Sequence, residues 1–334
     1  MSPLRYAALT AGLAALLIAC SSATPISPTI PVAPESPATV APASPPALST
    51  PATASGAPTA TPGRGVPAFK HIFVIVLENK EQIHVVGNQT APYFNQLIGQ
   101  YASASHFYGI RHPSLPNYLA LTGGDTFNVT SDCTGCFRNV DNLASQLKAA
   151  GRSWKAYMED MPGPCFVGDS PPLYAQKHNP FIYYDSVRND PVQCNQIVPL
   201  TQLSADMQAG TLPDFVWITP NLCNDMHDCP VHTGDAWLQT WVPQILATEE
   251  WKDQGVLFIT FDEGDTADGC CTYAQGGNIA TLVISPLGKP GFVSPVKYDH
   301  YSLLRTIETA WDLPLLGQAG CDCSPLMADL FAGQ

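Results

Sequence analysis

Hydrophobic positions along the chain fall into two patterns that predict different elements. Residues 71–77, HIFVIVL, form a continuous apolar, β-branched run, which is typical of a strand buried on both faces of a parallel sheet. Residues 142–150 carry apolar side chains at helical spacing and end at Gly151, which predicts a helix. The same criteria predict strands at 103–107, 153–158, 215–219, 256–261 and 278–285, and helices at 93–101, 115–122, 236–251 and 298–311.

Strands and helices therefore alternate over most of the chain. This order is typical of an α/β fold, and we expect a three-layer sandwich with helices on both faces of a mostly parallel sheet. We find no internal repeat. Residues 68–334 are long enough for one large core, so we expect them to form a single domain.

The first 67 residues lack this pattern. In residues 1–20, Arg5 precedes a short apolar run that ends in LIAC, too short to span a membrane but typical of an export signal. LIAC also resembles a bacterial lipobox, which implies cleavage before Cys20 and lipid attachment to its sulfur; an ordinary secretory signal is the alternative. Residues 21–67 are almost entirely Pro, Ala, Ser and Thr, which predicts a disordered, extended tether. We expect an exported lipoprotein facing outside the cytoplasm, with membrane contact only through Cys20.

Cysteines support this interpretation, because those other than Cys20 are even in number. In an exported chain they predict five disulfides. Cys133 and Cys136 have the spacing of a zinc knuckle, but no second pair stands at the matching distance. Spacing does not fix the pairing, although two pairs would each close a plausible loop: Cys165 with Cys194, and Cys223 with Cys229.

The formal net charge of −13 argues against nucleic acid as a partner, because such binding depends on basic groups that displace counterions. It does not exclude a small anionic substrate. A metal ion or a helix start can supply local positive charge despite the overall field.

Polar side chains follow two of the predicted strands at the point where each strand ends. Glu78 and Asn79 follow the first strand, and Asp262 and Glu263 follow the strand that ends at Phe261. In open α/β sheets the ligand crevice lies beyond the carboxyl ends of the strands. Oxygen-rich clusters of this kind suit a divalent cation, so we expect these four residues to bind one, whose identity the pattern does not fix.

A serine in the stretch HPSLPNY, residues 112–118, opens a predicted helix. The hydroxyl of Ser114 is a weak nucleophile until a base or a coordinated metal lowers its pKa, and a helix start beside it favours a phosphate or another oxyanion. Hydrogen bonds to that anion, or a proton for the leaving oxygen, could come from four further side chains: His112, Asn117, His227 and His300.

Each of these features also has a purely structural interpretation. A serine before Leu-Pro is typically a helix N-cap. Glu78 and Asn79 could end a strand in a turn, and residues 262–265, DEGD, could be an acidic loop. The stretch NDMHD, residues 224–228, lies between two cysteines and could be a stapled surface loop. The joint placement of these groups after strand ends favours the functional interpretation.

Five motifs, in order along the chain, resemble those of the phosphoesterase family. That family includes bacterial and fungal acid phosphatases and phosphocholine-type phospholipases C, and is related in fold to alkaline phosphatase. The resemblance runs from about His71 to Leu313. The motifs are EN at 78–79, HPSLPNY at 112–118, NDMHD at 224–228, FDEG at 261–264 and DHYSLLRTIE at 299–308.

The resemblance implies that Ser114 is the nucleophile and forms a phosphoserine. It also implies an alkaline-phosphatase-like fold and a divalent metal beside the serine, held by Glu78, Asn79, Asp262 and Glu263. Phosphate contacts, with one histidine as the general acid, would come from Asn117, His227 and His300. Asp225 is a weaker candidate, for orientation or for a second ion.

One departure bears on the substrate. In phospholipase members of this family, the Asp-Glu pair is followed by a pattern similar to paired glycines and Asp-His. In this chain, GDTADGCC follows Glu263 instead. This favours an acid phosphatase that hydrolyses small phosphate monoesters. A phospholipase C or phosphodiesterase of the same chemistry is the first alternative. The second is a tethered lipoprotein that binds phosphate ligands without turnover, against which the serine and the acidic pair argue.

Overall fold

The apolar run at the start of the domain forms the central strand of the sheet. In the computed structural model, which describes residues 65–333, β1 (Ile72–Leu77) is buried at every residue. The strands β5 (Phe215–Thr219) and β6 (Val256–Phe261) run parallel to it on either side. The predicted signal, the lipid site at Cys20 and residues 21–64 of the tether lie outside the described residues.

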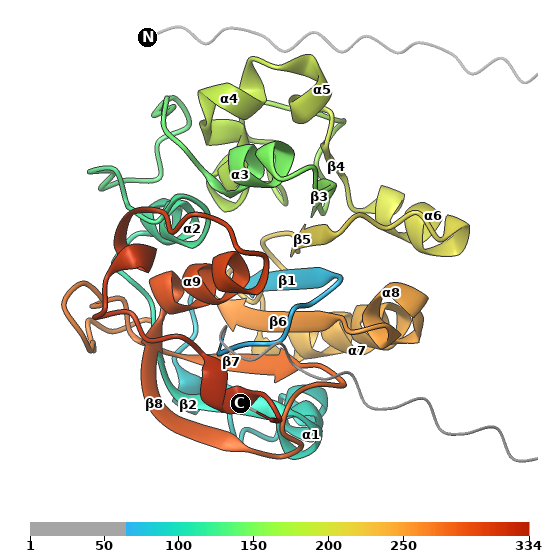
Figure 1. Ribbon diagram of the computed structural model, residues 1–334. Coiled ribbons are helices and arrows are strands. Elements are labelled where there is room, and N and C mark those ends of the chain that lie inside the picture. Colours follow the sequence, from blue (N-terminus) through green and yellow to red (C-terminus); the bar gives the residue numbers. More distant parts are fainter. Residues whose placement is uncertain (1–64, 334) are drawn as a thin grey trace, which may run out of the picture. The chain divides into compact units, whose positions relative to one another are not determined.

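Eight strands of the described chain form one sheet in the order β4-β3-β5-β1-β6-β7-β2-β8 (Figure 1). All neighbours run parallel except β7, which is antiparallel to both β6 and β2. The predicted mostly parallel α/β sheet is therefore confirmed. The remaining strands are β2 (Ala102–Tyr108), β3 (Trp154–Met158), β4 (Ile197–Pro199), β7 (Asn278–Ile284) and β8 (Val293–Asp299).

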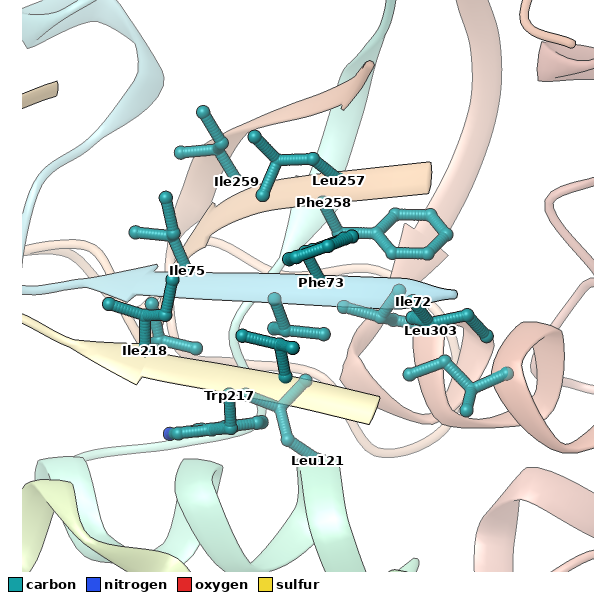
Figure 2. Close-up of a cluster of buried hydrophobic side chains, with 14 of the residues drawn as sticks. Ile72, Phe73, Ile75, Leu121, Trp217, Ile218, Leu257, Phe258, Ile259 and Leu303 are labelled. Atoms are coloured by element: carbon teal, nitrogen blue, oxygen red, sulfur yellow. The ribbon is translucent and has the colours of Figure 1, made fainter. Parts of the chain in front are cut away.

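Helices pack in two groups, α2 with α3 and α9, and α7 with α1 and α8. Figure 2 shows the core of the first group, where Leu121 of α2 lies by Trp217 of β5 and Leu303 of α9 by Ile72 of β1. The α-helices are α1 (Pro92–Gln100), α2 (Ser114–Gly123), α3 (Leu143–Ala149), α4 (Asp185–Arg188), α5 (Pro191–Cys194), α6 (Thr201–Ala209), α7 (Val231–Ala247), α8 (Glu249–Lys252) and α9 (His300–Ala310).

Most predicted elements are confirmed to within a few residues. The glycine stop after α2 is one case, because Gly124 has a φ of 74°, a left-handed conformation that glycine adopts without strain. Two expectations were wrong. The helix predicted from residue 298 begins at His300, because Tyr298 and Asp299 complete β8 and Asp299 caps the helix. The helix predicted for 236–251 begins earlier, at Val231, and is broken at Thr248.

Disulfides account for every cysteine among the described residues. The two predicted pairs are present, and Cys133 bonds to Cys136, so the zinc-knuckle interpretation was wrong. Within residues 65–333, no helix is both long and apolar enough to cross a bilayer. The five bonds are Cys133–Cys136, Cys165–Cys194, Cys223–Cys229, Cys270–Cys271 and Cys321–Cys323.

Candidate active site

The parallel register of β1 and β6 brings the two predicted acidic segments together. Leu77 pairs with Phe261, so the next residues, Glu78 and Asp262, leave the same edge of the sheet, and both are fully buried. The backbone N–H of Asn79 donates to Asp262 Oδ1 at 3.0 Å. The residue after β1 is thereby fixed to the side chain that follows β6.

Ser114 is the first residue of α2 and is only 2% exposed. Its hydroxyl does not cap the helix, because Pro113 occupies the N-cap position and no side-chain cap hydrogen bond is formed there. Instead Asp132 Oδ1 accepts the N–H of Leu115 at 3.0 Å. The N-cap interpretation of this serine was therefore wrong, and its hydroxyl is left for another contact.

That contact is Lys177, whose ammonium donates to Ser114 Oγ at 3.1 Å. The same nitrogen lies 3.3 Å from Asp132 Oδ2 and 3.7 Å from Glu78 Oε1. Ser114 Oγ and Glu78 Oε1 therefore both lie close to the same ammonium group, which brings the serine near this carboxylate. Burial alone would lower the pKa of Lys177, but the surrounding carboxylates raise it, so the lysine is charged. The sequence prediction missed Lys177.

His178 was also missed, although it lies at the centre of the buried charges. Its Nε2 contacts Glu78 Oε1, its Nδ1 lies 3.3 Å from Asp225 Oδ2, and its ring stacks on Tyr118 with centroids 5.2 Å apart. Burial would lower the pKa of His178, but the charge of Glu78 and the contacts with both carboxylates raise it to about 9. The His178 charge in turn outweighs burial at Glu78 and lowers the pKa of that carboxyl.

Asp262 and Glu263, the acidic pair after β6, have raised pKa values, in contrast to Glu78. Burial, with the charges of Glu78 and Glu263, raises the pKa of Asp262 well above its ordinary range. Burial and the charge of Glu78 raise the pKa of Glu263 to about 7, although His112 Nδ1 lies 3.1 Å from Glu263 Oε2 and opposes the rise. These two carboxyls therefore lack enough positive charge nearby to be ionised at low energetic cost.

The Asn117 side chain holds the loop that leads into Ser114. Its Oδ1 accepts the backbone N–H groups of Ile110 and Arg111 at 2.8 and 3.1 Å, and its Nδ2 donates to Glu263 Oε2 at 3.0 Å. His112, from the same loop, lies at the rim with its side chain 39% exposed, and its Nε2 is 2.7 Å from the Thr266 carbonyl oxygen. Asn117 is thus engaged by protein groups on both sides of its amide.

The two remaining predicted histidines differ in environment. The His227 side chain is 31% exposed, with Nδ1 2.6 Å from Asp228 Oδ1 and Nε2 3.8 Å from Glu78 Oε2. His300 is fully buried, and its Nε2–H donates to the backbone carbonyl of Asp262. Burial lowers the pKa of His300 to about 4 despite this hydrogen bond. At neutral pH His300 is therefore an uncharged imidazole.

The donor atoms at this edge fit a divalent cation. Both carboxylate oxygens of Glu78 and Asp262 Oδ2 are buried and form no hydrogen bond of acceptable geometry, a costly arrangement that a cation would relieve. Within residues 65–333, no three His, Cys, Asp or Glu side chains are already gathered around one point as metal ligands. The predicted set, Glu78, Asn79, Asp262 and Glu263, also includes the side-chain amide of Asn79, which is an oxygen ligand of another type.

Comparison with known proteins agrees with the motifs and the fold. The model of the phosphoesterase family matches residues 87–314. An acid phosphatase of Aspergillus fumigatus is 31% identical over 270 residues, which cover 78% of this chain and 58% of that protein. A phosphatidylinositol-3-phosphatase of Mycobacterium tuberculosis is 32% identical over 257 residues, which cover 76% of this chain and 81% of that protein.

Solved structures extend the comparison to the fold. A protein of the alkaline phosphatase superfamily from Vibrio parahaemolyticus superposes with a TM-score of 0.55 at 14% identity, covering 78% of this chain and 72% of that one. This supports the predicted fold. The alignment with the Aspergillus acid phosphatase spans little more than half of that protein's length. Because the family model matches more than half of the chain, this chain belongs to the phosphoesterase family.

Proposed function

We infer that this chain is a phosphoric ester hydrolase acting through a phosphoserine at Ser114, with small phosphate monoesters as its preferred substrates. One observation carries the inference: a buried serine hydroxyl is held at 3.1 Å by the Lys177 ammonium, which also lies 3.7 Å from the buried carboxylate of Glu78. A serine that served only to start a helix would not need this environment. The names of the related phosphatases support the same class of reaction.

The first step is attack by Ser114 on the phosphorus of the ester. A bond forms between Ser114 Oγ and phosphorus, and the bond from phosphorus to the alcohol oxygen breaks. The Lys177 charge lowers the pKa of the hydroxyl and stabilises its deprotonated form, so that the serine proton passes to solvent water, and the leaving alcohol oxygen takes a proton from His227. Ser114 is the first residue of α2, so the positive end of this helix would favour the negative charge of the phosphate oxygens. Water then hydrolyses the phosphoserine and releases inorganic phosphate.

A divalent metal completes this proposal. Glu78 and Asp262 would hold it, with Asn79 and Glu263 from the adjoining positions. When bound, such an ion supplies positive charge beside the attacking oxygen and the phosphate. The chain itself keeps Asp262 in place through two hydrogen bonds to its Oδ1, from the N–H of Asn79 and, at 2.6 Å, from that of Glu263.

His227 is the better placed of the two histidines to protonate the leaving alcohol. Its partial exposure gives it access to a substrate, and Asp228 fixes its Nδ1, so that Nε2 is the atom that carries the transferable proton. His300 cannot act in this way, because the Asp262 carbonyl engages its Nε2–H. We assign His300 as a positioning residue that holds the loop after β6.

A second candidate is the hydrolysis of a phosphate monoester on a lipid headgroup. It is favoured by the similarity to the Mycobacterium tuberculosis phosphatidylinositol-3-phosphatase, because that alignment covers most of both proteins. The chemistry at Ser114 would be the same. Only the recognition of the alcohol would differ.

An activity panel tests the proposed function. Purified protein would be assayed with 4-nitrophenyl phosphate, bis(4-nitrophenyl) phosphate, a phosphocholine ester and phosphatidylinositol 3-phosphate, before and after chelation and with divalent ions restored. We expect monoester turnover that is lost on chelation and recovered with metal. Turnover that survives complete chelation would contradict the metal, and faster diester turnover would favour the phospholipase or phosphodiesterase alternative. Binding without turnover of any ester would favour a phosphate-binding lipoprotein.

Export is part of the same proposal. The disulfides support an oxidising compartment. Lipid attachment is tested by labelling cells with a radioactive fatty acid, where we expect the full chain to be labelled and Cys20→Ala to be unlabelled. An unlabelled wild-type chain would leave a secretory signal as the explanation.

A further inference from the structure

A cleft of about 520 Å³ opens beside the candidate active site. It adjoins the site in two ways. His112 lines the cleft and contacts Glu263 at 3.1 Å, and the lining residues Ile110 and Arg111 precede Ser114 in a loop that is tied to Asn117. The volume falls in the range of pockets that bind small molecules. An ester whose phosphate is attacked by Ser114 therefore has room for its alcohol in this cleft.

The cleft contains a cation without a partner. The guanidinium of Arg111 forms no hydrogen bond or ion pair with any residue from 65 to 333, and its Nε is buried. Asp125 also lines the cleft, but its Oδ1 accepts the N–H of Phe127 at 2.9 Å and it forms no ion pair with Arg111. Buried charged donors are costly when unpaired. An anionic group on a ligand would provide the missing acceptor.

Other walls of the cleft suit a polyhydroxylated ligand. Tyr273 is 42% exposed and meets Tyr301 edge to face, with ring centroids 6.3 Å apart. An exposed tyrosine ring offers an apolar surface for the C–H face of a sugar or a cyclitol. Gln275 and the Asp125 carboxylate lie in the same lining, where they can exchange hydrogen bonds with hydroxyl groups.

We propose, on the basis of the proposed function, that this cleft binds the alcohol part of the ester and that Arg111 selects polyols carrying a second phosphate. Ser114 attacks one phosphate while the guanidinium binds the other through charge-assisted hydrogen bonds. The shared chemistry is a bisphosphorylated polyol, either free in solution or as the headgroup of a lipid.

Substrate ratios test the proposal. For wild type, Arg111→Gln and Arg111→Lys, kcat/KM would be measured with fructose 1,6-bisphosphate, fructose 6-phosphate and 4-nitrophenyl phosphate. We expect the wild type to prefer the bisphosphate over the monophosphate. Arg111→Gln should reduce that preference about tenfold or more, the loss expected for one charge-assisted contact, and Arg111→Lys should restore part of it. Lys252→Gln, which removes an exposed cation paired with Glu249, is the matched control and should keep the wild-type ratio.

An assay with a lipid substrate distinguishes a free bisphosphorylated polyol from the same group on a lipid. The wild type and Arg111→Gln would be compared on phosphatidylcholine vesicles containing phosphatidylinositol 3-phosphate. An Arg111-dependent preference for the soluble bisphosphate supports a free polyol, and an Arg111-dependent rate on vesicles alone supports a headgroup. If 4-nitrophenyl phosphate is turned over but neither the preference for the soluble bisphosphate nor the rate on vesicles depends on Arg111, the proposal is overturned. The proposed function would remain intact. If the wild type turns over no ester, the proposed function fails as well.

Discussion

Two halves of the candidate active site differ in the positive charge beside their buried carboxyl groups. In the paired half, Glu78 and Asp225 face the cations Lys177 and His178. The pKa of Glu78 is lowered although its carboxyl is buried, whereas burial raises the pKa of Asp225 against the opposing charge of His178. In the acidic half, Glu263 lies beside the partly exposed His112, and burial raises the pKa of both Asp262 and Glu263.

The difference shows where the chain balances its own charge and where it does not. In the paired half, Lys177 and His178 supply positive charge beside Glu78, whose two oxygens still lack a hydrogen bond of acceptable geometry and can bind a metal ion. The acidic half has more negative charge than the described residues neutralise, and its Asp262 Oδ2 has no hydrogen-bond donor. A divalent cation would supply the missing charge, and Ser114 lies beside the paired half, within reach of Lys177.

Removing the nucleophile is the largest predicted change. Ser114→Ala should lower kcat for 4-nitrophenyl phosphate by at least about 10³-fold, because the substitution removes the oxygen proposed to attack phosphorus. Steady-state kinetics measure this. Ser103→Ala removes another buried serine hydroxyl on β2 and should retain normal rates. If Ser114→Ala kept more than about a tenth of the wild-type kcat, the assignment of Ser114 as the nucleophile would be contradicted.

Neutralising the acidic half should be the next largest change. Asp262→Asn removes one charge but keeps the side-chain shape, so we expect divalent-ion affinity, measured by titration calorimetry, to fall on the order of 10²-fold or more. Asp206→Asn is the control, because that buried carboxylate lies outside the site and is already paired with Lys155, whose Nζ lies 2.6 Å from Asp206 Oδ2. Equal ion affinity in wild type and Asp262→Asn would show that the acidic half is not the metal site.

The paired half is tested through its lysine. Lys177→Gln should lower kcat by roughly 10- to 100-fold with a smaller change in KM, because the lost charge stabilises the serine oxygen during attack. Lys177→Arg should recover part of the rate. Lys155→Gln removes a partly buried, paired lysine outside the site and should leave kcat and KM unchanged. An unchanged kcat in Lys177→Gln would reduce this lysine to a structural role.

A smaller effect is predicted for Glu308, a buried carboxyl on α9 that resembles the acidic half but lies outside it. Burial raises the pKa of Glu308 to about 8, although the N–H of Leu316 donates to it. The folded protein therefore keeps a proton that the unfolded chain releases above its ordinary pKa of 4.5. Stability from this proton is complete below about pH 4.5 and is lost as pH rises through about 8.

Glu308→Gln should flatten this decline. We expect the free energy of unfolding of the variant, relative to wild type, to improve by up to about 5 kcal/mol between the acidic and the alkaline end of that window. Urea denaturation at several pH values measures it. Parallel pH profiles for the two proteins would mean that Glu308 is already ionised in the folded state.

The proximity of Glu78 to the acidic half was predictable from the sequence, because it depends on rules that act locally. A continuous apolar run predicts a central parallel strand, and parallel strands end at a common edge. Glu78 and Asp262 follow two such runs, so their proximity could be expected. The structure adds the register, Leu77 with Phe261, which makes them immediate neighbours.

The paired half was less predictable. Lys177 and His178 lie in a short 3-10 turn, Gln176–His178, which follows a stretch without hydrophobic periodicity. Lys177 reaches Ser114 across 63 positions of sequence, and only tertiary packing creates that contact. The edge strands β4 and β8 were missed for a related reason, since β4 has three residues and β8 mixes exposed and buried positions.

The central claim is that Ser114 becomes covalently phosphorylated during turnover. Protein mixed with 4-nitrophenyl phosphate would be quenched in acid within the first turnovers, digested, and mapped by mass spectrometry. The proposed chemistry predicts phosphate on the peptide that contains Ser114, absent from Ser114→Ala and from protein stripped of metal. An active wild-type protein that never carries phosphate on this serine, or carries it on a histidine, would contradict the proposal.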